Sequence, residues 1–243
     1  MREGKARRKA VIRAVVVGGV LITAAAAITL YTPWLGLFGL HEIIVSGNQR
    51  ISAEEIGRAA DLRSGQPILS ISRASVAERV GALPWIKETL LERVFPHAVR
   101  IRVVERLPIA WTETGDGERC LTIGEGGVVV DDTCADRGEV FELVGALRTG
   151  DGPGAVLVDA HVSTLMEAVR DLAIPGVRIQ QIDVSDLSSV ILCDESGLRI
   201  LLGAIESYTR RVEALVALSR KVDIREYSSI DLRLEGEATL VRW

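Results

Sequence analysis

The chain has 243 residues, of which 48% are apolar and 26% are charged, the proportions of an ordinary folded protein. Its formal net charge is −4, but six basic residues and a single acidic one precede Ala14. The remainder therefore holds 23 basic and 32 acidic residues, a net charge of about minus nine. Such a surface repels phosphate backbones, so the composition argues against nucleic-acid binding.

The first elements in chain order are a basic tail, residues 1–13, and a long apolar segment. No charged residue occurs from Ala14 to Leu40, and residues 14–34 reach the roughly 20 residues that span a bilayer core. This pattern predicts a transmembrane helix over residues 14–34, with the tail in the cytoplasm and the rest of the chain outside it. A cleaved signal peptide is the alternative, because the basic start and the small residues Ala24–Ala27 also fit that pattern.

Residues 38–107 have the pattern of a small α+β domain. Ser52 and Glu55 form a capping box that marks the start of a helix. In chain order the expected elements are a strand at 41–45, helices at about 52–62 and 72–83, and strands at 85–95 and 98–105. This order predicts two helices on one face of a three-stranded sheet.

The last of these strands alternates between two kinds of residue. Val99, Ile101 and Val103 fall on one face, while Arg100 and Arg102 fall on the other. Such alternation is typical of a sheet with one face in water. In the preceding strand, two acidic residues are expected to stand opposite the arginines as cross-strand partners, Glu88 and Glu92.

The alternation fails between Glu105 and Pro108, because Glu105 would point into the core and Pro108 cannot donate a hydrogen bond in a central strand. We therefore predict a bend there that leads into a second domain, residues 108–243. Short strands punctuated by glycine turns, with helices at about 162–172 and 205–221, make this domain mostly β. The predicted fold class is α+β: a transmembrane helix, a small two-helix domain, then a mostly β domain with two helices.

The chain shows no sequence pattern of a catalytic, cofactor or metal site. The three histidines, His41, His97 and His161, lie far apart and beside no cysteine or carboxylate at the spacing of metal ligands. Nucleophile elbows, zinc-protease helices and phosphate-binding loops are also missing from the sequence. Together with a single membrane anchor, this pattern predicts a binding protein with no catalytic residue, cofactor, metal or small-molecule substrate.

Three cysteines are too few for a disulfide framework. Outside the cytoplasm, Cys120 and Cys134 could close one loop around the turn at 123–127. The alternative is that Cys120, Cys134 and Cys193 are all small buried residues. The sequence leaves both possibilities open.

Several stretches together resemble a known family. They are IIVSGNQRISAEEI (43–56), LPWIKETLLERVFPHAVRIRVVERLPIAW (83–111), GVVVD (127–131) and SSIDLRLEG (228–236). With the basic tail and apolar segment before them, they make the chain similar to the FtsQ/DivIB family of bacterial cell-division proteins. The stretch from Ile43 to Trp111 resembles the POTRA domain of that family, which we expect over residues 38–107.

The resemblance implies a non-enzymatic scaffold of the divisome, held in the cytoplasmic membrane at the division septum. Its implied partners are single-pass coiled-coil proteins of the FtsB/DivIC and FtsL type and other divisome components. Through them it would help control septal peptidoglycan synthesis. A partner of this kind adds a strand to the sheet edge near the C-terminus, which corresponds here to about Ile230–Val241.

Within that edge, Arg233 matches a family arginine that can meet a partner carboxylate. The partner-binding residues implied by the resemblance are Ile230, Asp231, Leu232, Arg233, Leu234 and Glu235. The chain departs from better-known members at Leu234, where an aromatic residue often stands. Without the resemblance, Arg233 would be interpreted as an exposed sheet residue.

Two other functions remain as alternatives. One is a membrane-anchored envelope hydrolase whose site assembles from residues distant in sequence; a deep cleft joining His97 or His161 to carboxylates would favour it. The other is a POTRA-containing adaptor of an outer-membrane assembly or secretion system. An exposed strand edge would favour the scaffold.

Overall fold

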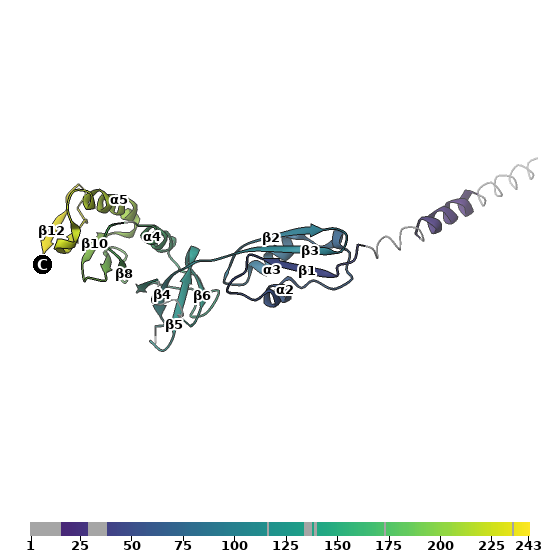
Figure 1. Ribbon diagram of the computed structural model, residues 1–243, viewed down its shortest axis with the longest axis horizontal. Helices are drawn as coiled ribbons and strands as arrows, with labels where there is room; N and C mark the ends of the chain where they lie inside the picture. Colours follow the sequence, from purple (N-terminus) through teal and green to yellow (C-terminus); the bar gives the residue numbers. More distant parts are fainter. Residues whose placement is uncertain are drawn as a thin grey trace, which may run out of the picture. The chain divides into compact units, whose positions relative to one another are not determined.

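The computed structural model describes residues 16–28, 38–115, 117–133, 138, 140–172, 174–234 and 236–243 (Figure 1). The chain divides into two compact units. The first comprises the described residues up to Val80 together with Thr89–Val103, and the second comprises Gly81–Glu88 and Val104–Trp243.

Near the N-terminus, residues 16–28 are helical. The hydroxyl of Thr23 donates to the carbonyl oxygens of Gly19 and Val20 at 3.0 Å, as expected of a threonine inside a helix. The predicted basic tail and the remainder of the predicted membrane span lie outside the described residues. Within the described ranges, none of the helices has both the length and the hydropathy needed to cross a membrane.

Residues 42–105 form a three-stranded sheet with two α-helices. The elements are β1 (Glu42–Ser46), α2 (Ala53–Ala60), a 3-10 turn (Ile68–Ser70), α3 (Arg73–Gly81), β2 (Ile86–Val94) and β3 (Ala98–Glu105). The sheet order is β1-β3-β2, with β1 parallel to β3. This matches the predicted order of strand, helix, helix, strand and strand.

Both helices begin where the sequence indicates. The Ser52 hydroxyl accepts a hydrogen bond from the backbone N–H of Glu55 at 3.1 Å, which caps α2. Ser72 plays the same part before α3 by accepting from the N–H of Ser75. Each helix buries two apolar residues almost completely, Ile56 and Ala60 in α2 and Val76 and Val80 in α3.

Strand β3 confirms the predicted alternation. Val99, Ile101 and Val103 are buried, whereas Arg100 and Arg102 have partly exposed side chains. The two arginines lie 3.6 and 3.4 Å from Glu92 of β2, so this acid is their cross-strand partner. Exposed pairs of this kind contribute about 1 kcal/mol or less, and the buried face contributes most of the stability.

The second unit is built on one nine-stranded sheet with the order β12-β11-β10-β9-β8-β7-β4-β5-β6. Most neighbouring strands are antiparallel, but β4 with β7, β7 with β8, and β10 with β11 are parallel. The strands are β4 (Pro108–Glu113), β5 (Cys120–Gly124), β6 (Val128–Asp131), β7 (Phe141–Val144), β8 (Ile179–Asp183), β9 (Val190–Asp194), β10 (Arg199–Gly203), β11 (Tyr227–Asp231) and β12 (Thr239–Arg242).

Two α-helices pack on this sheet, α4 (Ala160–Arg170) and α5 (Tyr208–Ser219). Asp159 caps α4 by accepting from the N–H of His161 at 2.7 Å. The apolar side of α4 is buried in a continuous core that includes Leu165, Met166 and Ile182. Helix α5 contributes its single fully buried residue, Leu215, to the same core. The second unit is therefore the mostly β structure that the sequence indicates.

The predicted bend between the two sheets is short. Strand β3 ends at Glu105 and β4 begins at Pro108, so only two residues separate them. Contrary to the prediction, Pro108 is not in the bend but is the first residue of β4, an internal strand. Its missing N–H costs little because pairing with β7 begins only at Ala110.

Candidate partner-binding edge

Strand β12 is the outermost strand at one end of the nine-stranded sheet (Figure 1). It pairs antiparallel with β11 through Leu240 opposite Ile230 and Thr239 opposite Asp231. Among the described strands, no other pairs with β12. Its outer backbone N–H and C=O groups therefore form the kind of edge to which another strand can add.

The side chains along this edge are largely exposed. Val241 is 52% exposed and the C-terminal Trp243 is 68% exposed. Arg242 lies over the ring of Tyr227 at 5.6 Å, and its guanidinium is 3.2 Å from a carboxylate oxygen of Glu226. The edge thus presents apolar and aromatic side chains with one cation between them.

The six residues implied as partner-binding occupy different environments. Ile230 and Leu232 are buried in the core, and Ile230 and Asp231 belong to β11, which has neighbours on both sides. Leu234 is 65% exposed. Glu235 lies outside the described residues. The outer edge itself is formed by β12, at residues 239–242, which the sequence reasoning included only as part of a broader range.

Arg233 is held in place by Asp231, the last residue of β11. Its guanidinium Nη2 donates to the Asp231 carboxylate at 2.6 Å, and its Nε donates to the same carboxylate at 2.9 and 3.0 Å. These hydrogen bonds lower the pKa of Asp231 below its ordinary value and raise the pKa of Arg233. The aliphatic stem of Arg233 lies against Gly203, where an added Cβ would come within 3.1 Å of it.

Beside this edge lies a groove of about 400 Å³ between α5 and the segment that joins β11 to β12. We call it the basic groove. Its charged residues are three cations, Arg210, Arg211 and Lys221, and one acid, Glu237. Its apolar wall includes Leu218, Leu232 and Leu234. Within the described part of the chain, the buried Nη1 of Arg211 has no hydrogen-bond partner. The three cations of the groove outnumber its one acid, so the groove favours a partner that brings carboxylates.

The charge around this edge differs from that of the preceding part of the chain. Residues 205–243 contain seven basic and seven acidic residues, whereas residues 38–204 contain 16 basic and 25 acidic ones. An acidic partner is therefore repelled less at the C-terminal edge than elsewhere on the chain.

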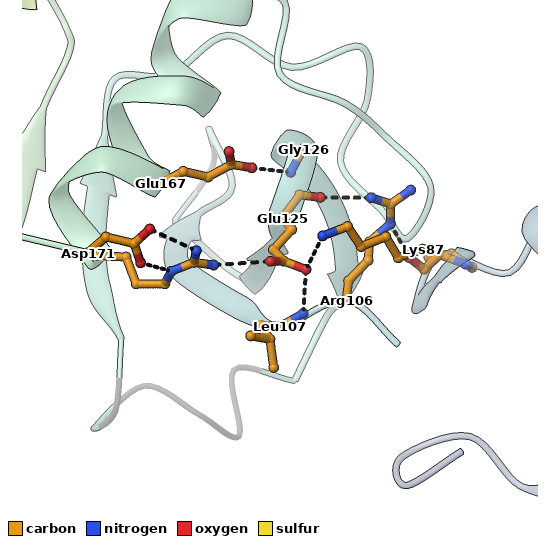
Figure 2. Close-up of polar contacts among 9 residues, drawn as sticks. Lys87, Arg106, Leu107, Glu125, Gly126, Glu167 and Asp171 are labelled. Carbon is orange, nitrogen blue, oxygen red and sulfur yellow. Dashed lines mark hydrogen bonds and ion pairs between the residues drawn. The ribbon is translucent and has the colours of Figure 1, made fainter. Parts of the chain in front are cut away.

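A second polar centre lies around Glu125, in the 3-10 turn between β5 and β6, within the second unit (Figure 2). The Glu125 carboxylate accepts from Lys87 Nζ at 3.2 Å, from the Leu107 N–H at 3.3 Å and from Arg170 Nη1 at 3.2 Å. Burial raises the pKa of Glu125, but these hydrogen bonds outweigh it and bring the pKa below its ordinary value.

The neighbours of Glu125 complete a network of structural contacts. Arg106 donates to the carbonyl oxygens of Glu125 at 2.9 Å and of Pro84 at 3.2 Å, while Arg170 is also held by Asp171 at 2.8 Å. The backbone N–H of Gly126 donates to Glu167 (Figure 2). Every charged group in this centre has a partner, so we assign it to stability rather than to ligand binding. The sequence reasoning missed it because its members lie up to 84 residues apart, from Lys87 to Asp171.

The histidines and cysteines are placed as follows. His41 and His97 contact each other edge to face at 5.8 Å, and His161 lies in the first turn of α4. No cluster of three or more potential metal ligands occurs among the described residues.

Cys120 is disulfide-bonded and Cys193 is free. Cys134 lies outside the described residues, so its pairing with Cys120 stays a prediction.

Asp194, the last residue of β9, is a buried acid and is only 5% exposed. Its carboxylate accepts from the backbone N–H groups of Ser196 and Leu198, each at 2.9 Å. It therefore shapes the turn between β9 and β10 from inside.

Comparison with known proteins shows which class of protein this chain belongs to. The family model described as "POTRA domain, FtsQ-type" matches residues 38–106, the part of the chain that contains β1 to β3, α2 and α3. The chain is therefore a POTRA-domain protein of the FtsQ type.

Curated relatives extend the similarity beyond that domain. The chain is 33% identical over 177 residues to Cell division protein FtsQ of Mycobacterium tuberculosis, covering 73% of this chain and 54% of that protein. It is 26% identical over 219 residues to Cell division protein FtsQ of Streptomyces coelicolor, covering 82% and 80%. The match thus spans about half the length of the mycobacterial relative. The chain belongs to the FtsQ/DivIB family of bacterial cell-division proteins.

Proposed function

We propose that this protein is a non-enzymatic scaffold of the divisome that recruits a single-pass coiled-coil protein of the FtsB/DivIC type, and through it one of the FtsL type. The observation that carries the proposal is the outer edge of β12. In this function the partner adds a short strand to that edge. Main-chain hydrogen bonds supply affinity, and alternate side chains supply specificity.

The basic groove supports the same proposal. A helix that precedes the added strand can lie along α5, with its acidic side chains facing Arg210, Arg211 and Lys221. Its apolar side chains can cover Leu234, which is otherwise exposed. The partner is therefore expected to carry a carboxylate close to its added strand.

The proposed setting is the division septum, where the protein helps control septal peptidoglycan synthesis. The apolar segment at residues 14–34 would anchor it in the cytoplasmic membrane, and the basic residues before that segment favour a cytoplasmic N-terminus. Both folded units would then lie outside the cytoplasm.

Proline substitutions at two neighbouring positions of β12 test the strand addition. Successive N–H groups of a strand point alternately inward and outward, so Leu240→Pro and Val241→Pro remove one of each kind. The full chain in nanodiscs is titrated with the FtsB/DivIC-type protein of the same organism. We expect the proline that removes the outward N–H to weaken binding at least about 100-fold while the urea midpoint of unfolding stays near the wild-type value.

Charge reversal at two arginines tests the basic groove separately. Arg211 lies in α5, and Arg220 directly follows that helix. Arg211→Glu should weaken partner binding about tenfold or more, because it places a negative charge where a partner carboxylate lies. Arg220→Glu, outside the basic groove, is the matched control and should have little effect. Full affinity in both proline variants would exclude strand addition at β12, and equal effects of the two arginine substitutions would exclude the groove.

A further inference from the structure

Besides the basic groove, the second unit contains an apolar pocket that β12 does not line. It has a volume of about 330 Å³ and is bordered by the ends of β7 and β8 and by the start of α4. Gly145 lies at the end of β7 with φ of +81°, and an added Cβ there would overlap Ser185. This close approach of the two strand ends requires glycine and forms one wall of the pocket. Val162 and Val184, which are both buried, also line the pocket.

Apolar side chains around this pocket are exposed. Leu147 is 74% exposed and Val158 is 62% exposed, and both line the pocket. Leu187, at 37%, completes the apolar border. The two most exposed residues are joined by their backbones, since Val158 donates its N–H to the Leu147 carbonyl at 2.9 Å. Exposed apolar side chains gathered around a hollow are typical of interaction sites.

The charges around the pocket are negative. Asp159 lines it, and Asp186 stands between the lining residues Ser185 and Leu187. Their carboxylates accept hydrogen bonds from the backbone N–H groups of His161 and Ser188, and no cation of the described chain lies within ion-pair distance of them. Arg148, beside Leu147 in sequence, is paired with Asp151 at 3.0 Å and has a side chain only 9% exposed. We call this site the acid-rimmed pocket.

The acid-rimmed pocket and the basic groove have opposite charges, so a single type of segment does not suit both. We infer that the acid-rimmed pocket is a second docking surface, for a partner segment that places an apolar side chain beside lysine or arginine. The volume is at the small end of the range of about 300 to 1,000 Å³ found for binding pockets, which suits one or two side chains. The carboxylates at the rim then orient the segment through its cations.

The charge also argues against a lipid surface as the occupant. Anionic headgroups would be repelled by Asp159 and Asp186, and the pocket has no free cation at its rim among the described residues to attract them. A basic and apolar protein segment satisfies both properties of the site. This inference concerns a different surface from the β12 edge and does not depend on strand addition there.

A pair of synthetic peptides tests the inference on the full chain in phosphatidylcholine nanodiscs. The probe is a fluorescein-labelled hexapeptide of sequence KLLKLK, and its counterpart is ELLELE. We expect KLLKLK to bind at least about tenfold more tightly than ELLELE at low salt. The preference should shrink in about 0.5 M NaCl, because salt screens the rim charges.

Variants then locate the binding. Leu147→Ser with Val158→Ser should weaken KLLKLK binding at least about tenfold, and Asp159→Asn with Asp186→Asn about fivefold. Asparagine keeps the acceptor oxygen that the helix cap and the turn use, so the second pair changes charge with little change of structure. Leu234→Ser, an exposed leucine of the basic groove, is the matched control and should leave KLLKLK binding unchanged.

Four outcomes would overturn the inference. The first is no binding of KLLKLK up to about 1 mM. The second is binding that neither pocket variant weakens, in a protein whose urea midpoint is unchanged. The third is equal binding of ELLELE. The fourth is tight binding of the chain to phosphatidylglycerol vesicles that the Leu147 and Val158 substitutions abolish, which would assign the surface to lipid.

Discussion

The two outermost strands of the nine-stranded sheet differ in whether other backbone covers their outer edge. At one end, β12 pairs with β11 alone among the strands that the structure describes. At the other end, β6 is covered by residues 154–157, which exchange backbone hydrogen bonds with it. Gly154 donates to Val129, Val129 donates to Ala155, and Leu157 donates to Gly127, at 2.8 to 2.9 Å. A chain that covers one edge with its own backbone and leaves the other open makes the open edge the natural place for a partner.

The same contrast holds for side chains. At the covered end, Leu157 is buried and the Glu125 network joins β5, β6 and α4. At the open end, ion pairs such as Arg225 with Asp223 and Arg242 with Glu226 lie in water. Stability is therefore concentrated near β6, and exposed groups that can be rearranged at low cost lie near β12.

The largest expected effect on stability is at the covered end of the sheet, beside β6. Leu157→Ala removes a buried side chain that packs against Gly127 and should lower the free energy of unfolding by about 2 to 4 kcal/mol. Val241→Ala at the open edge should change it by less than about 0.5 kcal/mol. Urea unfolding of both variants measures the contrast. Equal losses would show that the two ends do not differ in this way.

A smaller effect is expected for the polar centre. Glu125→Gln leaves Lys87 and Arg170 without their shared carboxylate and should cost about 1 to 2 kcal/mol at pH 7. Since the pKa of Glu125 is lowered in the folded state, its contribution is present above the unfolded value near about 4.3 and is lost as pH falls through the folded value. The difference between wild type and variant should therefore shrink in acid, as urea midpoints at several pH values would show.

The smallest effect on stability is expected at the exposed pair near the open end. Hydrogen bonds from Arg225 lower the pKa of Asp223 to about 2. Arg225→Ala should move this pKa upward toward about 3.9, although the backbone N–H of residue 225 still donates to the carboxylate. Carboxyl NMR titration measures the shift. Because the pair is fully exposed, a large fall in the urea midpoint would contradict the proposed distribution of stability.

Much of the first sheet was predictable from sequence because its signals are local. The Ser52 cap and the alternation of Val99, Ile101 and Val103 each depend on neighbours within a few residues. The same holds for β8, β9 and β10, each of which is a short apolar run between turn residues. The position of β4 was less clear, because a proline at the first residue of a strand resembles a proline in a bend.

The candidate sites were less predictable, because each depends on residues that meet only after folding. Asp231 and Arg233 were expected on an edge, but β12 takes the outer position and leaves Ile230 and Leu232 in the core. The Glu125 network joins residues of β2, the β5–β6 turn and α4. The acid-rimmed pocket likewise needs Gly145 beside Ser185, 40 residues apart.

The order of the helices and strands, the apolar stretch near the N-terminus and the resemblance to a cell-division family could be inferred from the amino-acid sequence, since they depend on composition, periodicity and short motifs. Which strand is outermost, which edge is covered and which charges stand unpaired around an apolar hollow became clear only from the folded chain. The reason is physical: strand order and side-chain neighbours are set by backbone pairing and burial between distant segments, and a local pattern carries little information about either.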